Sequence, residues 1–149
     1  IDEPGGSIGS TQISNTLYNF NLEVTTGYVP VWTDVATEFD YVQWVRDAFS
    51  ATLTMTYKHH TTGDAEQHKF EANTARLVRR EFVGPAVATP GTTYSNYTFQ
   101  INAAGVYTEY THDEQDGNDT KVGVLTIGHD LTASQGLDFV VVNESTTLP

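Results

Sequence analysis

The sequence predicts an all-β protein, an antiparallel β-sandwich or jelly roll of about eight strands with one short helix. Three observations support this class. Apolar and polar residues alternate over most of the chain, as in Tyr18–Val24, and a period of two is typical of strands with one buried face. Threonine, which favours strands, is the commonest residue, 23 of 149. Turn-forming segments separate the alternating stretches at short intervals, as in sandwiches and barrels.

Each expected strand is an alternating or apolar segment bounded by glycine, proline or polar residues. The segment 67–83 is ambiguous between helix and strand, and we favour a strand near its end. The expected strands cover residues 17–26, 28–32, 51–58, the end of 67–83, 97–101, 106–110, 121–127 and 136–142. Polar or turn-forming connections are expected at 59–64, 84–91, 102–105 and 112–120.

One segment has a different period. Apolar residues recur at spacings of three and four between Val35 and Phe49, which is the spacing of one helix face. This spacing predicts the short helix over 38–49, and a strand through 40–45 is the alternative.

The core is expected to contain the apolar side of 51–58, namely Leu53, Met55 and Tyr57. Phe139–Val142 is apolar on both faces, which predicts a strand covered on both sides. The aromatic residues of the first third of the chain also follow strand or helix spacing, so they are expected in the core rather than on a ligand platform: Trp32, Phe39, Trp44 and Phe49.

Composition suggests three parts. Residues 1–16 are rich in glycine, serine and threonine and predict an N-terminal arm, residues 17–142 the β-domain, and residues 143–149 a polar C-terminal tail. The arm carries two isolated apolar residues, Ile8 and Ile13, which are candidates for contact with a neighbouring subunit.

Charge and composition exclude several classes of partner. Acidic residues outnumber basic ones 19 to 7, and the formal net charge is −12, so nucleic acid and anionic membrane surfaces are disfavoured. No apolar stretch is long enough to predict a membrane span. The chain has no cysteine, which removes disulfides, thiolate nucleophiles and cysteine-ligated metals. An acidic, lysine-poor and threonine-rich composition resembles that of halophilic proteins, whose repulsion is screened by salt.

No motif predicts catalysis or a cofactor. The sequence has neither a Gly-x-Ser-x-Gly nor a His-Glu-x-x-His motif. His59 and His60 are adjacent, so on a strand they would point to opposite faces, and His112 and His129 are isolated. We therefore predict no catalytic residue, no cofactor and no histidine metal site.

The acidic turn at 113–119 is the one weak candidate for cation binding, through Asp113, Asp116 and Asp119. Carboxylates are the ligands that Ca²⁺ prefers, but the spacing fails the EF-hand pattern. A long hairpin tip, which Gly117 and Asn118 favour, is the preferred interpretation.

Two further sets of residues are candidates for surface functions. Three sequons at Asn96, Asn118 and Asn143 lie in or beside expected turns, where a glycan fits. Three of the four arginines cluster at Arg76, Arg79 and Arg80, which predicts either an intersubunit ion-pair patch or ordinary surface charge balance.

A short stretch resembles a known structural class. Residues 97–107 (YTFQINAAGVY) resemble the F-x-I-x-x-x-G-x-Y corner of extracellular β-sandwich and jelly-roll domains. Together with the halophile-like composition and the polar arms, the chain resembles jelly-roll structural proteins of viruses that infect haloarchaea. The resemblance implies a capsid, vertex, decoration or spike component located in the virion, and it assigns no residue roles.

The leading hypothesis is therefore a non-enzymatic virion subunit that binds copies of itself or other virion proteins through its arms and edges. One alternative is an archaeal cell-surface or filament β-sandwich module, located outside the cell. A further alternative is a glycan-binding or glycan-cleaving domain, because a sandwich fold does not determine function.

Overall fold

The structure is a computed structural model. It describes residues 1–3, 6–13, 16–35, 38–46, 48–89, 94–115, 118–128 and 136–144. Within these ranges, residues 32–35, 38–44, 46, 115 and 118 are described by their backbone alone.

The described chain forms eight strands and one helix, and all strand pairings are antiparallel. The predicted all-β class with one short helix is confirmed. In chain order the elements are β1 (Leu17–Thr25), β2 (Tyr28–Val35), β3 (Glu38–Arg46), β4 (Ser50–Lys58), α1 (Thr61–Glu71), β5 (Arg76–Ala86), β6 (Asn96–Gln115), β7 (Asn118–Ile127) and β8 (Leu137–Val142).

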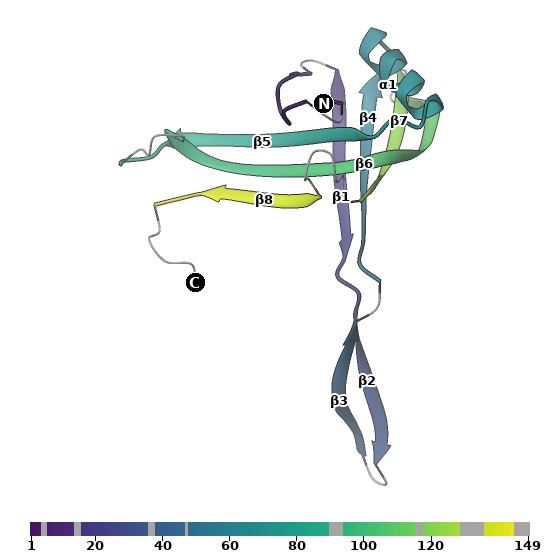
Figure 1. The fold of residues 1–149 in the computed structure, drawn as a ribbon, viewed down its shortest axis with the longest axis vertical. Helices are drawn as coiled ribbons and strands as arrows, with labels where there is room; N and C mark the ends of the chain where they lie inside the picture. Colours follow the sequence, from purple (N-terminus) through teal and green to yellow (C-terminus); the bar gives the residue numbers. More distant parts are fainter. Residues whose placement is uncertain are drawn as a thin grey trace.

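Six strands form one curled sheet in the order β1-β4-β7-β6-β5, and β8 also pairs with β6. The strand β6 is long enough to serve two neighbours on one edge, because β7 pairs with its residues 105–115 and β8 with its residues 98–103. In Figure 1, β5, β8 and the first half of β6 run across the direction of β1 and β4. The sheet therefore has a body around β1, β4 and β7, and a lateral part that we call the wing, made of β5, β8 and residues 96–103 of β6.

Gly105 lies where β6 passes from the wing to the body. A Cβ atom at this position would be 2.2 Å from the carbonyl oxygen of Thr126 and 2.7 Å from Cδ2 of Leu125, so only glycine fits the close approach of β6 and β7. The turn predicted at 102–105 is wrong, because β6 continues through these residues while it changes partners. Glycine indicated a break in the pattern, but it marks a close backbone approach rather than a chain reversal.

The core lies on one face of the body. Leu53, Met55 and Tyr57 of β4 are fully buried, as predicted. They pack with four residues of three other strands, β5, β6 and β7: Val78, Ala103, Tyr107 and Leu125. The alternation of β4 thus places every second side chain in the core, where burial of apolar area stabilises the fold.

The helix is not where the sequence predicted it. Residues 38–46 form β3, which pairs along β2 from Val35–Glu38 to Tyr28–Arg46, so the predicted helix over 38–49 is wrong and the alternative strand is confirmed. The segment is rich in aromatic and β-branched residues, and pairing with a neighbouring strand outweighed its apolar spacing.

The observed helix α1 falls on residues predicted as a polar loop and on part of the ambiguous segment. The buried residues of α1 are Gly63 and Glu66, and neither has a large apolar side chain. The sequence of α1 therefore lacks the apolar stripe by which an amphipathic helix is predicted. Asp64 in its first turn and Lys69 in its last turn suit the helix dipole. No helix in the described residues is long and apolar enough to cross a membrane.

The described part of the N-terminal arm lies against its own domain. Asp2 forms a β-bridge with Leu77, and its buried carboxylate accepts hydrogen bonds from the N–H groups of Gly9, Ser10 and Thr11. These hydrogen bonds therefore close the arm into a loop around the buried carboxylate of Asp2.

Candidate functional site

The strands β2 and β3 form a two-stranded sheet of their own, which we call the ribbon. The chain enters it from β1 and leaves it into β4, and Figure 1 shows it extending away from the six-stranded sheet. Strands of eight and nine residues correspond to a length of about 25–30 Å. The ribbon therefore protrudes from the rest of the described molecule.

Apolar side chains of the ribbon are exposed. Tyr28 is 58% exposed, and Val29 and Val45, which lie directly opposite each other, are exposed as well. Phe49, just beyond the ribbon, is 49% exposed, so its predicted place in the core is wrong. The side chains of Trp32, Phe39 and Trp44 lie outside the described part. An isolated two-stranded sheet is only marginally stable in water, so these surfaces favour a partner.

The wing exposes a second apolar surface. The rings of Phe82 and Phe99 are stacked with centroids 6.0 Å apart, and those of Phe99 and Phe139 with centroids 6.3 Å apart. We call these three residues the phenylalanine row, and all three are exposed. The guanidinium carbon of Arg80 lies 5.1 Å from the centroid of Phe82, a cation–π distance.

The edge of the wing is formed by β8, which is also apolar. Phe139 is 52% and Val141 is 62% exposed, so the prediction that Phe139–Val142 is covered on both sides is wrong for this single chain. Apolar composition alone does not distinguish a strand covered within its own domain from one that a partner covers. Among the described strands β8 pairs only with β6, which leaves its outer edge as a template for another strand.

A polar network is buried between α1 and the sheet. Glu66 accepts two hydrogen bonds from Arg76, of 2.9 and 2.7 Å, and one of 3.0 Å from the hydroxyl of Tyr107. The hydroxyls of Tyr107 and Tyr57 are 2.9 Å apart. Burial raises the pKa of both tyrosines. The network pairs the Glu66 carboxylate with Arg76 and ties α1 to the sheet, although Nη1 of Arg76 is buried without a hydrogen-bond partner among the described residues.

The arginine cluster is divided by the fold. Arg76 is 4% exposed, so its predicted surface position is wrong. Arg79 donates from Nε to Asn102 and is half-buried, whereas Arg80 is exposed beside the phenylalanine row. Only Arg80 retains the position that an intersubunit contact needs. No sequence pattern distinguishes these three residues, because the partner of Arg76 is ten residues away on α1.

The apolar residues of the arm lie partly buried against the chain itself. Ile8 and Ile13 are half-buried, and Ile13 lines a cavity of about 170 Å³ between the arm and the sheet, together with Met55 and Val78. In this arrangement the described arm contacts its own domain, and its predicted contact with a neighbour stays a prediction.

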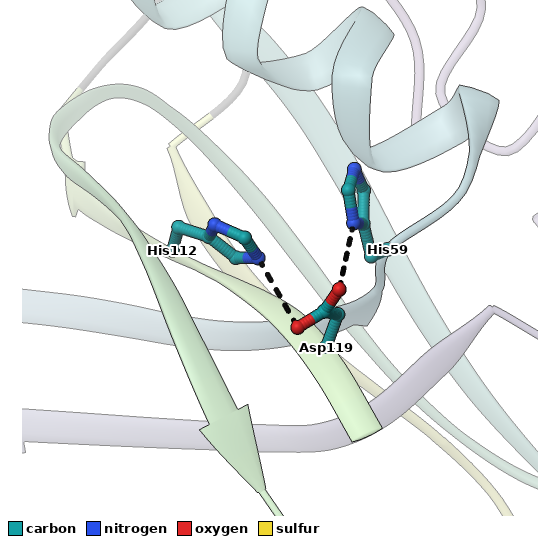
Figure 2. A group of neighbouring side chains, drawn as sticks. All are labelled: His59, His112 and Asp119. Atoms are coloured by element: carbon teal, nitrogen blue, oxygen red, sulfur yellow. Dashed lines mark ion pairs between the residues drawn. The ribbon is translucent and has the colours of Figure 1, made fainter. Parts of the chain in front are cut away.

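A group of two histidines and one aspartate lies at the end of the body next to α1 (Figure 2). Nδ1 of His59 is 3.6 Å from Oδ2 of Asp119, and Nε2 of His112 is 3.7 Å from its Oδ1. The ring centroids are 5.1 Å apart. All three residues are exposed. Each carboxylate oxygen therefore faces one imidazole nitrogen.

Sheet register brings this group together. Lys58 of β4 pairs with Thr120 of β7, which places His59 opposite Asp119, and the N–H of His59 donates to the carbonyl of Asp119. His112 of β6 pairs with Lys121, so it lies diagonal to Asp119 on the same face. The sequence analysis predicted that His112 is isolated, because it lies 53 positions after His59 in the chain. Only the strand order β4-β7-β6 brings the two histidines together.

The predicted acidic cation candidates do not form one group in the described residues. Asp113 follows His112 on β6, so it points to the opposite face from Asp119. The carboxylate of Asp113 accepts from the N–H of Glu114, and Asp116 lies outside the described part. Only Asp119 of the three belongs to the group in Figure 2.

The three sequons differ in their surroundings. The side-chain amide of Asn96 donates to the carbonyl of Gly84 and accepts from Ser95, so its nitrogen is engaged within the fold. Asn143 is exposed, and the side chain of Asn118 lies outside the described part.

No protein-family model matches the chain, and no curated protein matches it either.

Proposed function

We propose that this protein is a non-enzymatic structural subunit of a virion, and that it assembles with copies of itself through the ribbon and the outer edge of β8. The observation that carries the proposal is the ribbon, two strands that extend from the body and expose Tyr28, Val29 and Val45. Such an element has little to stabilise it within one chain.

The wing supports the same proposal from a second side. It combines an exposed phenylalanine row with an apolar edge strand whose residues include Phe139 and Val141. Pairing of β8 with β8 of a second copy continues the sheet and covers apolar area in one step. An interface between identical patches is also the commonest arrangement in homo-oligomers.

Charge sets the conditions for assembly. Subunits with a net charge of −12 repel one another, and salt shortens the range of that repulsion to about 3 Å at 1 M. Assembly through apolar surfaces is therefore expected to strengthen in molar salt, where the hydrophobic contribution persists and repulsion is screened.

The test compares the whole chain with two variants. Because Thr25 pairs with Ser50, replacing 26–49 by Asn-Gly leaves a two-residue hairpin loop and removes the ribbon. Val141→Lys places a charge at the β8 edge, and Thr111→Lys, at an exposed position of β6, is the matched control.

Sedimentation velocity in 0.15 and 2 M KCl is the measurement. We expect oligomers of the natural chain and of Thr111→Lys in 2 M salt, and a shift towards monomer for the ribbon deletion and for Val141→Lys. A natural chain that stays monomeric at high concentration in 2 M salt overturns the proposal, as do variants that assemble normally.

A separate experiment tests whether the protein belongs to the virion or to the cell surface. Mass spectrometry of purified virus particles and of host cell-surface fractions distinguishes the virion subunit from the cell-surface or filament module. Enrichment in particles is the expected result, and enrichment in surface fractions contradicts it.

A further inference from the structure

The geometry points to a metal site: we propose that His59, His112 and Asp119 bind one divalent transition-metal ion of the Zn²⁺ type. The residues offer two imidazole nitrogens and a carboxylate oxygen, whose candidate atoms all lie within 4.8 Å of one another. Nitrogen and carboxylate ligands of this kind are typical of Zn²⁺ sites with an open position.

The distances fit a site that closes around an ion. At 3.6 and 3.7 Å the two contacts with Asp119 are too long for hydrogen bonds. Ligand atoms bound to one tetrahedral Zn²⁺ at about 2.0–2.1 Å are separated by about 3.4 Å. Small side-chain rotations therefore bring the nitrogens and one oxygen into coordination, and the strands of the sheet need not move.

A second observation concerns the other nitrogen of His59. Its Nε2 faces Oδ1 of Asp64 on α1 at 3.7 Å, while its Nδ1 faces Asp119. Lys121 holds Asp64 through an ion pair, and this hydrogen bond lowers the pKa of the Asp64 carboxyl. A histidine that binds a metal usually directs its other N–H towards a carboxylate, which orients the ring. Asp64 is placed for that role.

The neighbouring lysine, Lys121, is paired with an acid of its own. Lys121 of β7 lies opposite His112 in the sheet. Its ammonium group is bound by the carboxylate of Asp64 and by Oε1 of Gln67. Its charge is therefore compensated locally. The group is exposed, so an ion reaches it from solvent and water completes the coordination. A bound ion links β4, β7 and β6 at this end of the body.

The test uses tag-free, EDTA-treated protein and titration calorimetry with ZnCl₂. We expect one Zn²⁺ per chain, and an affinity about tenfold or more weaker in His59→Gln, His112→Gln and Asp119→Asn, because loss of a ligand costs at least as much as loss of its supporting partner. The matched control is His68→Gln, since His68 forms an exposed histidine–carboxylate pair with Glu71 at 3.1 Å but has no third ligand among the described residues.

A second measurement keeps the proposal testable if a variant does not fold. In the natural chain, Zn²⁺ should shift the imidazole NMR resonances of His59 and His112 and leave those of His68 unchanged. The proposal is overturned if millimolar Zn²⁺ gives no saturable binding, if the ligand variants bind like His68→Gln, or if the three histidines respond equally. Sedimentation in EDTA separates this result from the proposed assembly, which needs no metal.

Discussion

At the scale of single residues, the fold depends on buried charges that are satisfied within the chain. Glu66 is 5% and Asp2 is also 5% exposed; the first binds Arg76 and Tyr107, and the second binds backbone N–H groups of the arm. A buried carboxylate is costly without such partners, so each one fixes the position of a segment with few apolar contacts. Glu66 fixes α1, and Asp2 fixes the arm.

Asp2→Asn should loosen the arm. Burial alone acts to raise the pKa of Asp2, but the hydrogen bonds from Ser10, Thr11 and Gly9 outweigh it and lower the pKa to about 2. An amide cannot accept all of these bonds, so we expect a loss of about 1–3 kcal/mol in the free energy of unfolding at pH 7.

The effect of this substitution should depend on pH. Because the folded-state pKa of Asp2 lies below its unfolded value of 3.8, its stabilisation is complete above about pH 4 and is lost as pH falls through about 2. Urea unfolding at pH 7, 5, 3 and 2 should show the natural chain and Asp2→Asn converging towards the acid end. A constant difference between them across this range contradicts the assigned role.

At the scale of elements, β6 organises the sheet. It pairs with β5 and β8 in the wing and with β7 in the body, and the change of neighbour occurs beside Gly105. A long strand in a strongly curled sheet needs a position where two backbones come close, and glycine provides it.

Gly105→Ala should therefore disturb the junction of wing and body. The added Cβ would lie 2.2 Å from the Thr126 carbonyl oxygen, and we expect a loss of about 2–4 kcal/mol in the free energy of unfolding from the forced backbone shift. Gly128→Ala is the control, because nothing lies within 4 Å of its added Cβ. Equal unfolding midpoints in denaturant for the two variants would contradict this role of Gly105.

At the scale of the whole molecule, net charge and exposed apolar area act in opposite directions. The charge of −12 keeps chains apart, whereas the ribbon and the wing expose apolar side chains that favour contact. Salt concentration shifts the balance between the two, because it screens the charge.

Stability should consequently increase with salt. We expect the thermal unfolding midpoint to rise between 0.1 and 2 M KCl, because self-repulsion of the folded chain is screened. A variant with four exposed acids neutralised, Glu23→Gln, Glu81→Gln, Glu109→Gln and Asp138→Asn, should show a smaller rise, as followed by circular dichroism. An equal slope for both proteins means that the acidic surface is not the cause.

Properties that depend on local pattern and composition could be predicted from the amino-acid sequence. Alternation predicted the strand at β1 and the core positions of β4, including Leu53 and Tyr57, which are fully buried. A polar turn and a continuous apolar run predicted the strands at β7 and β8. Strand alternation is visible in the sequence because neighbouring side chains point to opposite faces, so every second residue of a half-buried strand is apolar.

Features that depend on long-range register could be seen only once the strands were paired. Pairing with β2 made 38–46 a strand, and polar contacts such as Glu66–Arg76 support a helix without an apolar stripe. The group of His59, His112 and Asp119 exists only because β4, β7 and β6 are neighbours. Strand order and register join residues far apart in the chain, and the physical reason is that a shift of one position would turn each side chain to the other face.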